Sequence, residues 1–116
     1  MNTGVQDTVA GATDVRLLSC DALVGRMATG DERAFEEVFD RLAMRAIALV
    51  HLCGVNDARC DEIVSAAFLE VWRRSPRVDL SHGGSAAWIL AVVCRTTAGA
   101  LDDREAPVVR PASVTR

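Results

Sequence analysis

The chain has no lysine and no tyrosine, and only 4% of its 116 residues are aromatic. Without lysine it cannot form a Walker phosphate-binding loop, and the GxSxG, GxGxxG and HExxH motifs of hydrolases, dinucleotide-binding proteins and zinc proteases are also missing. No apolar run approaches the roughly 18 residues that span a bilayer, and the N-terminus lacks the basic-then-apolar order of a signal peptide. We therefore expect a non-enzymatic, cytoplasmic protein without cofactor or membrane contact.

Composition indicates a folded domain but not a generally basic one. Half of the residues are apolar and a quarter are charged, as in globular proteins, and the length suits one domain with a single core. The net charge is −3, whereas proteins that bind nucleic acid by phosphate attraction alone are usually basic. Any contact with nucleic acid would therefore need a local basic patch.

Apolar residues recur at helical spacing through most of the chain, and no stretch alternates like a β-strand. The pattern predicts four helices, of which the first is short and capped by Ser19 or Asp21. The longer helices are expected at about residues 32–53, 57–75 and 86–101. The predicted fold class is all-α, a small bundle of about four helices over residues 17–102, with flexible tails at 1–16 and 103–116.

The longest predicted helix starts at the cap Asp31 and stops at Gly54, and Asn56 or Asp57 starts the next one. Its apolar stripe consists of Phe35, Val38, Phe39, Leu42, Ala46, Leu49, Val50 and Cys53.

The next helix has two distinct faces. One is the stripe of a buried face and consists of Cys60, Ile63, Val64, Ala67, Phe68 and Val71. The other collects small residues, one leucine and terminal charges, namely Glu62, Ser65, Ala66, Leu69 and Arg73. This second face is either an ordinary solvated surface or a docking face for another helix.

The four cysteines admit two interpretations. Cys53 and Cys60 continue apolar stripes, which predicts buried, inert thiols. They also flank one turn with His51, and Cys94 could lie nearby, so a redox or metal sensor stays an alternative. No CxxC pair is present, and we therefore predict no metal site and leave any role of Cys20 open.

One face of the last helix and the loop before it carry the local positive charge. Trp88, Val92, Arg95 and Gly99 share a side of the helix, which suits either base stacking with phosphate contact or a core tryptophan beside a solvated arginine. A basic cluster adjoins this side and comprises Arg73, Arg74, Arg77 and His82.

The helices and the loop described above, taken in their order along the chain, resemble region 2 of the extracytoplasmic-function (ECF) sigma factors. GDERAFEEVFDRLAMR (Gly30–Arg45) is similar to the family's first long helix, and DEIVSAAFLEVWRRSPRVD (Asp61–Asp79) to its polymerase-binding helix and following turn. GGSAAWILAVV (Gly83–Val93) resembles the start of the promoter-melting helix. The resemblance covers roughly residues 20–101.

The resemblance implies two binding sites. The partner of the first is core RNA polymerase, through the clamp helices of its β′ subunit, and the implied residues are Asp61, Glu62, Ser65, Ala66, Leu69 and Arg73. The second would take the promoter −10 element, probably as a single strand with one flipped base, and its implied residues are Arg74, Arg77, Asp79, His82, Trp88, Val92 and Arg95.

Departures from the family pattern leave a second interpretation open. Ser65 and Ala66 stand where the family usually has glutamine and an acid, and Arg95 alone keeps the charge of a normally basic run. Asp102 and Asp103 place acids where arginines are usual. The 116 residues end before any helix-turn-helix domain for the −35 element, so we expect either the N-terminal part of a longer factor or a stand-alone sigma-like protein. The alternative is a degenerate sigma-like regulator that binds polymerase, a sigma factor or an anti-sigma factor without reading DNA.

Overall fold

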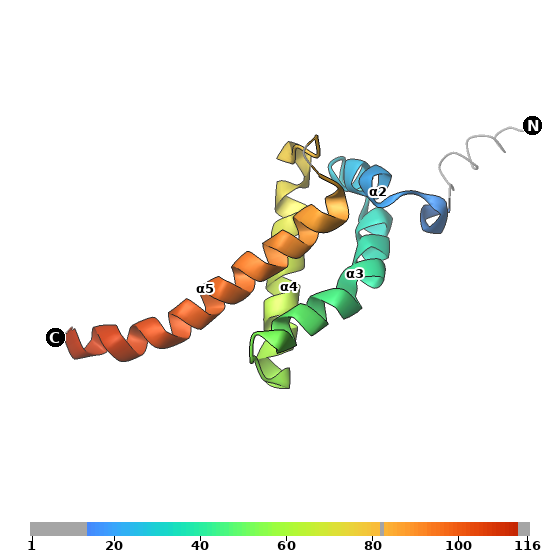
Figure 1. The fold of residues 1–116 in the computed structure, drawn as a ribbon. Coiled ribbons are helices and arrows are strands. Elements are labelled where there is room, and N and C mark those ends of the chain that lie inside the picture. Colours follow the sequence, from blue (N-terminus) through green and yellow to red (C-terminus); the bar gives the residue numbers. More distant parts are fainter. Residues whose placement is uncertain (1–13, 82, 114–116) are drawn as a thin grey trace, which may run out of the picture.

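Four α-helices and two short 3₁₀ helices make up the described fold (Figure 1). The structure, a computed structural model, describes residues 14–81 and 83–113, with side chains as far as Asp102. The elements are η1 (Val15–Leu17), α2 (Cys20–Met27), α3 (Glu32–Leu52), α4 (Asp57–Arg74), η2 (Ser75–Arg77) and α5 (Ser85–Ser113). These ranges contain no strand, so the predicted all-α class is confirmed.

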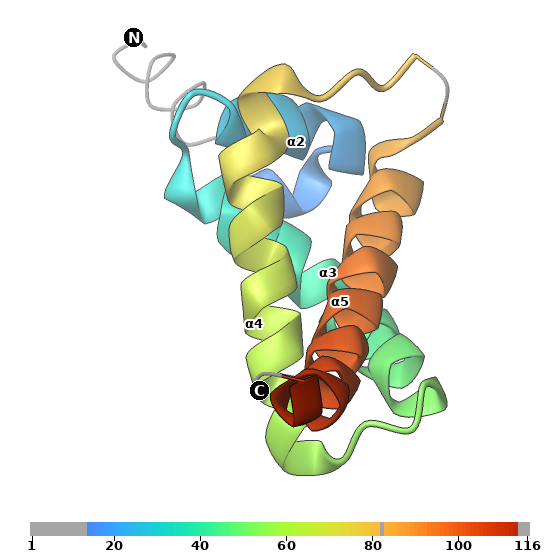
Figure 2. The same cartoon turned by 90° about the vertical axis from the view of Figure 1, so that its left-hand side faces the viewer.

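One core joins the α-helices. α4 packs against both α3 and α5, and α2 packs against α3 at the end of the bundle where α5 begins (Figure 2). Each helix contributes at least one side chain with 2% exposure or less, among them Leu23, Val38, Phe68 and Ile89. Among the described residues, no helix combines the length and the apolar character that a membrane crossing requires.

Side-chain caps fix where the helices start. Ser19, Asp31 and Asn56 each accept hydrogen bonds from backbone N–H groups in the first turn of α2, α3 and α4. Thus Ser19 rather than Asp21 caps α2, and Asn56 rather than Asp57 caps α4. Gly30 and Gly54 have φ angles of 92° and 85°, a left-handed conformation that glycine adopts without strain and that lets the chain turn between helices.

Only part of the apolar stripe predicted for α3 is fully buried. Phe35 and Leu49 are partly buried, and Phe39 is 36% exposed. α2, α4 and α5 all pack against α3, and the Phe35 and Phe39 rings pack edge-on against rings of α4. Phe35 meets Trp72 with ring centroids 5.3 Å apart, and Phe39 meets Phe68 at 4.9 Å.

Helical elements extend past the expected domain bounds at both ends. Of the expected tail 1–16, residues 1–13 lie outside the described residues, but Arg41 holds η1 by donating from Nη2 to the carbonyls of Val15 at 3.2 Å and Arg16 at 3.0 Å. At the other end, α5 continues as helix to Ser113 rather than ending near Leu101. That part projects from the bundle (Figure 1). Its sequence has no helical apolar period, which is why the prediction ended the helix earlier. Its flexibility stays a prediction.

Asp21 does not cap its own helix but joins α2 to the start of α5. Its Oδ1 accepts the backbone N–H of Ser85 at 2.8 Å, across 64 residues of chain. A carboxylate is favourable there because the first N–H groups of a helix carry partial positive charge. Hydrogen bonding by Ser85 lowers the pKa of the Asp21 carboxyl.

We expect Asp21→Asn to reduce the free energy of unfolding at neutral pH and to change it little in acid. Because folding keeps the Asp21 pKa below its ordinary value of 3.8, the folded state favours the ionised form. This stabilisation is present above the ordinary pKa and is lost as the pH falls through the lower folded-state pKa. Urea unfolding of both proteins at a series of pH values from neutral into the acid range measures the difference, and a difference independent of pH would contradict the prediction.

Candidate functional site

The exposed side of α4 carries all six residues that the resemblance assigns to polymerase binding. We call this side the α4 outer face; it consists of Asp61, Glu62, Ser65, Ala66, Leu69 and Arg73, and every one is exposed. The opposite stripe, from Cys60 to Val71, has exposures of 4% or less. Leu69 is 51% exposed. The division of α4 into a buried and an exposed face is therefore as the sequence predicted.

An apolar hollow adjoins Leu69, and sequence reasoning did not find it. Phe35 and Trp72 line it together with Leu69, and the carboxylates of Glu32 and Glu36 border it. It lies where α3 packs against α4, so it depends on tertiary contact rather than on any pattern within one helix. A partner side chain seated on Leu69 would meet two aromatic rings with negative charge beside them.

A groove between α4 and α5 brings the predicted DNA-binding residues together. It consists of two adjoining hollows that share Glu70, Arg73 and Arg74, and we call it the α4–α5 groove. The first hollow is lined further by Arg77, Val78, Asp79 and Trp88, and the second by Ala66, Val92, Arg95 and Thr96. The two helices that form its walls run side by side in Figure 2.

Glu70 occupies the part that both hollows share. Its Oε1 lies 3.1 Å from Arg73 Nη2, and its Oε2 accepts from Arg74 Nε. Arg74 first, and then Arg73, lower the pKa of the Glu70 carboxyl. Within the part of the chain that the structure describes, Arg77 and Arg95 have no carboxylate at ion-pair distance. Two of the four arginines are thus paired.

Not every predicted DNA-binding residue lies on the accessible surface. Val92 is 1% exposed and belongs to the core, so the expectation that it shares an open face with Arg95 is wrong. The cause is that α5 packs against both α3 and α4, which widens its buried sector. Trp88 is partly buried against the core, and His82 lies outside the described residues.

Asp79 organises the loop before α5. Its Oδ1 accepts the backbone N–H of Ser81 at 2.9 Å, and this hydrogen bond lowers the pKa of the Asp79 carboxyl. The same side chain borders a smaller hollow with Trp88 and the glycines Gly83 and Gly84. The loop and the tryptophan therefore meet at one end of the α4–α5 groove.

The cysteines do not form a cluster. Cys60 is buried as predicted, and burial raises the pKa of its thiol, which makes it a poor nucleophile. Cys53 is exposed, contrary to prediction, because it caps the C-terminus of α3 at the turn. Cys94 is exposed and Cys20 partly buried. Over the described ranges, no group of three or more potential ligands could hold a metal ion.

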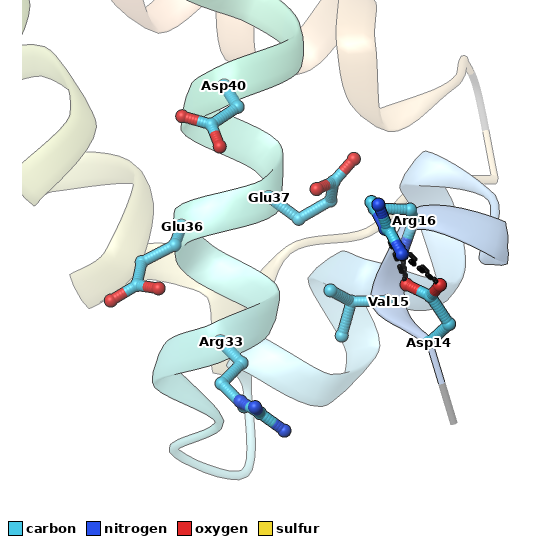
Figure 3. Close-up of a pocket in the computed structure, with 7 residues that line it drawn as sticks. All are labelled: Asp14, Val15, Arg16, Arg33, Glu36, Glu37 and Asp40. Atoms are coloured by element: carbon cyan, nitrogen blue, oxygen red, sulfur yellow. Dashed lines mark hydrogen bonds and ion pairs between the residues drawn. The ribbon is translucent and has the colours of Figure 1, made fainter. Parts of the chain in front are cut away.

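Another hollow lies where η1 meets α3 (Figure 3). Some of its charged side chains pair with near neighbours. Asp14 pairs with Arg16 at 2.8 Å, which lowers the Asp14 pKa to about 2. Glu37 pairs with Arg41 at 2.8 Å. In Figure 3, Glu36 points away from the Asp14–Arg16 pair. The hollow therefore does not present a cluster of side chains of one charge.

Comparison with curated proteins points to one group. The ECF RNA polymerase sigma factor SigK of Mycobacterium tuberculosis (strain H37Rv) and that of Mycobacterium bovis (strain BCG) are each 33% identical over 75 residues, which is 65% of this chain and 40% of the relative. SigK of Mycolicibacterium vanbaalenii is 26% identical over 90 residues, 78% of this chain and 46% of the relative.

The matched part is less than half of these relatives' own length. No family model matches the chain, and no solved structure matches it. The sequence similarity agrees with the all-α fold and with the motifs in the three long helices. Over the matched residues, the chain is similar to ECF RNA polymerase sigma factors.

Proposed function

We propose that this chain acts in transcription initiation, binding core RNA polymerase through the α4 outer face and the promoter −10 strand in the α4–α5 groove. The partner surface on polymerase is the pair of clamp helices of the β′ subunit. The observation that carries the proposal concerns the two sides of α4. The α4 outer face is exposed, with the Leu69 side chain 51% exposed, whereas the stripe on the opposite side is buried.

The α4 outer face suits a partner helix. Ser65 and Ala66 are small, so a second helix can approach closely, and Leu69 offers an apolar anchor next to the hollow of Phe35 and Trp72. Large apolar side chains near the centre of an interface, surrounded by polar groups, commonly carry much of the binding energy. The acidic residues at the start of the face favour a partner with basic side chains there.

The α4–α5 groove suits a single strand better than a duplex. Its arginines are spread along its length, and Trp88 stands at one end beside the loop of Asp79. Arginines along a groove contact phosphates, and an aromatic ring stacks with an unpaired base. With a protein net charge of −3, this local charge rather than overall attraction would hold the strand.

Polymerase binding is tested by titrating the full chain into core RNA polymerase or an isolated β′ clamp-helix fragment. We expect a saturable complex between the chain and the polymerase or its fragment at micromolar concentration. If none forms, the sigma-like docking mode is wrong.

Arg95→Ala is expected to weaken binding of a −10 non-template single strand about three- to tenfold, because one unpaired arginine leaves the groove. The plot of log affinity against log salt should become shallower by about 0.7 for the lost phosphate contact. Fluorescence anisotropy with a labelled oligonucleotide measures both quantities.

The matched control is Arg45→Ala, which removes an exposed arginine of α3 outside the groove. It should leave affinity nearly unchanged. Equal losses in the two variants would show that overall charge, not the groove, determines binding.

The regulator without DNA binding remains the second candidate, and one observation favours it. Glu70 pairs with Arg73 and Arg74 in the middle of the groove, which reduces the positive charge available to a strand. Polymerase binding without detectable single-strand binding would support this candidate. Its partners would then include a sigma factor or an anti-sigma factor.

A further inference from the structure

We propose that Glu70 acts as an internal competitor for phosphate, holding Arg73 and Arg74 so that the α4–α5 groove binds a single strand weakly until this carboxylate is displaced. The inference rests on the proposed function in so far as the groove takes a polyanion. It assigns to Glu70 a restraint on strand binding, whereas the residues that the resemblance implies all promote binding.

The geometry makes one carboxylate serve two arginines. Glu70 precedes Arg73 by three residues and Arg74 by four, so all three side chains lie on neighbouring positions of α4. Each carboxylate oxygen faces a different guanidinium, with Oε1 3.1 Å from Arg73 Nη2 and Oε2 accepting from Arg74 Nε. The Glu70 side chain is 30% exposed, and those of Arg73 and Arg74 are 62% and 50% exposed, so solvent screens both pairs in part.

A phosphodiester would have to replace Glu70 at both guanidinium groups. Carboxylate and phosphate oxygens use the same donors on arginine, so the two cannot occupy them together. Only Arg77 and Arg95 are free of ion pairs among the described residues of the groove. Displacement thus changes the groove from two available arginines to four.

The test compares Glu70→Gln with the unaltered chain for binding of a short −10 single strand. Glutamine keeps the size of the side chain and removes its charge. Two released arginines are expected to raise affinity about three- to tenfold. With about 0.7 per additional phosphate contact, the plot of log affinity against log salt should become steeper by about 1.4.

A matched control exists elsewhere in the chain. Glu37 pairs with Arg41 at 2.8 Å with the same four-residue spacing, but on α3 and outside the groove. Glu37→Gln changes the net charge equally and should leave single-strand affinity unchanged. An equal gain in both variants would overturn the inference, because net charge alone would then explain it.

The Arg74 Nε–H signal in NMR spectra provides a readout without DNA. In the unaltered chain it should exchange slowly with water because it donates to Glu70, and in Glu70→Gln its protection should fall. An unchanged signal would overturn the inference whatever the binding result.

The binding results also separate this inference from the proposed function. If the unaltered chain fails to bind DNA and Glu70→Gln binds, Glu70 is a complete block and the proposed binding of the −10 strand by the unaltered chain is wrong. If both bind equally, the Glu70 inference is wrong and the groove assignment stands. If neither binds, both are wrong.

Discussion

Replacing Phe68 by alanine is expected to lower the free energy of unfolding by about 3–5 kcal/mol. Phe68 is 2% exposed, lies in the buried stripe of α4, and packs edge-on against the Phe39 ring. Its loss removes a large apolar surface and leaves a cavity that the packed helices fill only in part. In a domain of this length, such a loss is a large fraction of the total stability.

Urea unfolding followed by circular dichroism measures the change. Leu69→Ala is the natural control, since Leu69 adjoins Phe68 in the chain but is 51% exposed. We expect it to cost less than about 1 kcal/mol, as surface substitutions usually do. Similar losses in the two variants would mean that α4 does not have one buried and one exposed face.

Replacing Leu69 by arginine is expected to reduce affinity for core RNA polymerase at least tenfold, or about 1.4 kcal/mol, while leaving the fold intact. The apolar anchor beside Phe35 and Trp72 is lost, and a guanidinium would have to lose its water against the partner helix, although Glu32 and Glu36 lie beside the hollow. Surface plasmon resonance with immobilised polymerase measures the affinity, and circular dichroism checks the fold.

The control makes the same substitution at another exposed leucine. Leu52 is 82% exposed at the C-terminal end of α3, outside the α4 outer face. Leu52→Arg should bind polymerase as the unaltered chain does. If it loses affinity as much as Leu69→Arg, the added charge rather than the site is responsible, and the assignment of the α4 outer face fails.

Features set by local physics could be predicted from the sequence. The caps Asp31 and Asn56 follow from side chains that accept N–H groups of the next turn. The two faces of α4 follow from apolar residues spaced three and four apart. The prediction for Val92 failed because periodicity indicates a face but not its width, and contact with two helices widened the buried sector of α5.

Only part of the candidate site could be predicted, because spacing within one helix does not show which helices pack together. The α4 outer face belongs to one helix, so spacing gave its exposed residues except Asp61, which only the resemblance implied. The hollow of Phe35 and Trp72 requires α3 to pack on α4 and has no signature within either helix. Glu70 did have a sequence signal, since it lies three and four residues before Arg73 and Arg74. That spacing predicts the pairs but not their place in a groove, which depends on α5.

The central claim is that the α4 outer face contacts the β′ clamp helices, and site-specific photo-crosslinking tests it most directly. A photoreactive amino acid at Ser65, exposed in the middle of this face, is placed in the full chain and irradiated with core RNA polymerase. The control carries it at Ala48, exposed on α3. The account predicts crosslinks from position 65 to the clamp helices and none from position 48. Crosslinks from position 65 to another subunit, or equal yields from both positions, would contradict it.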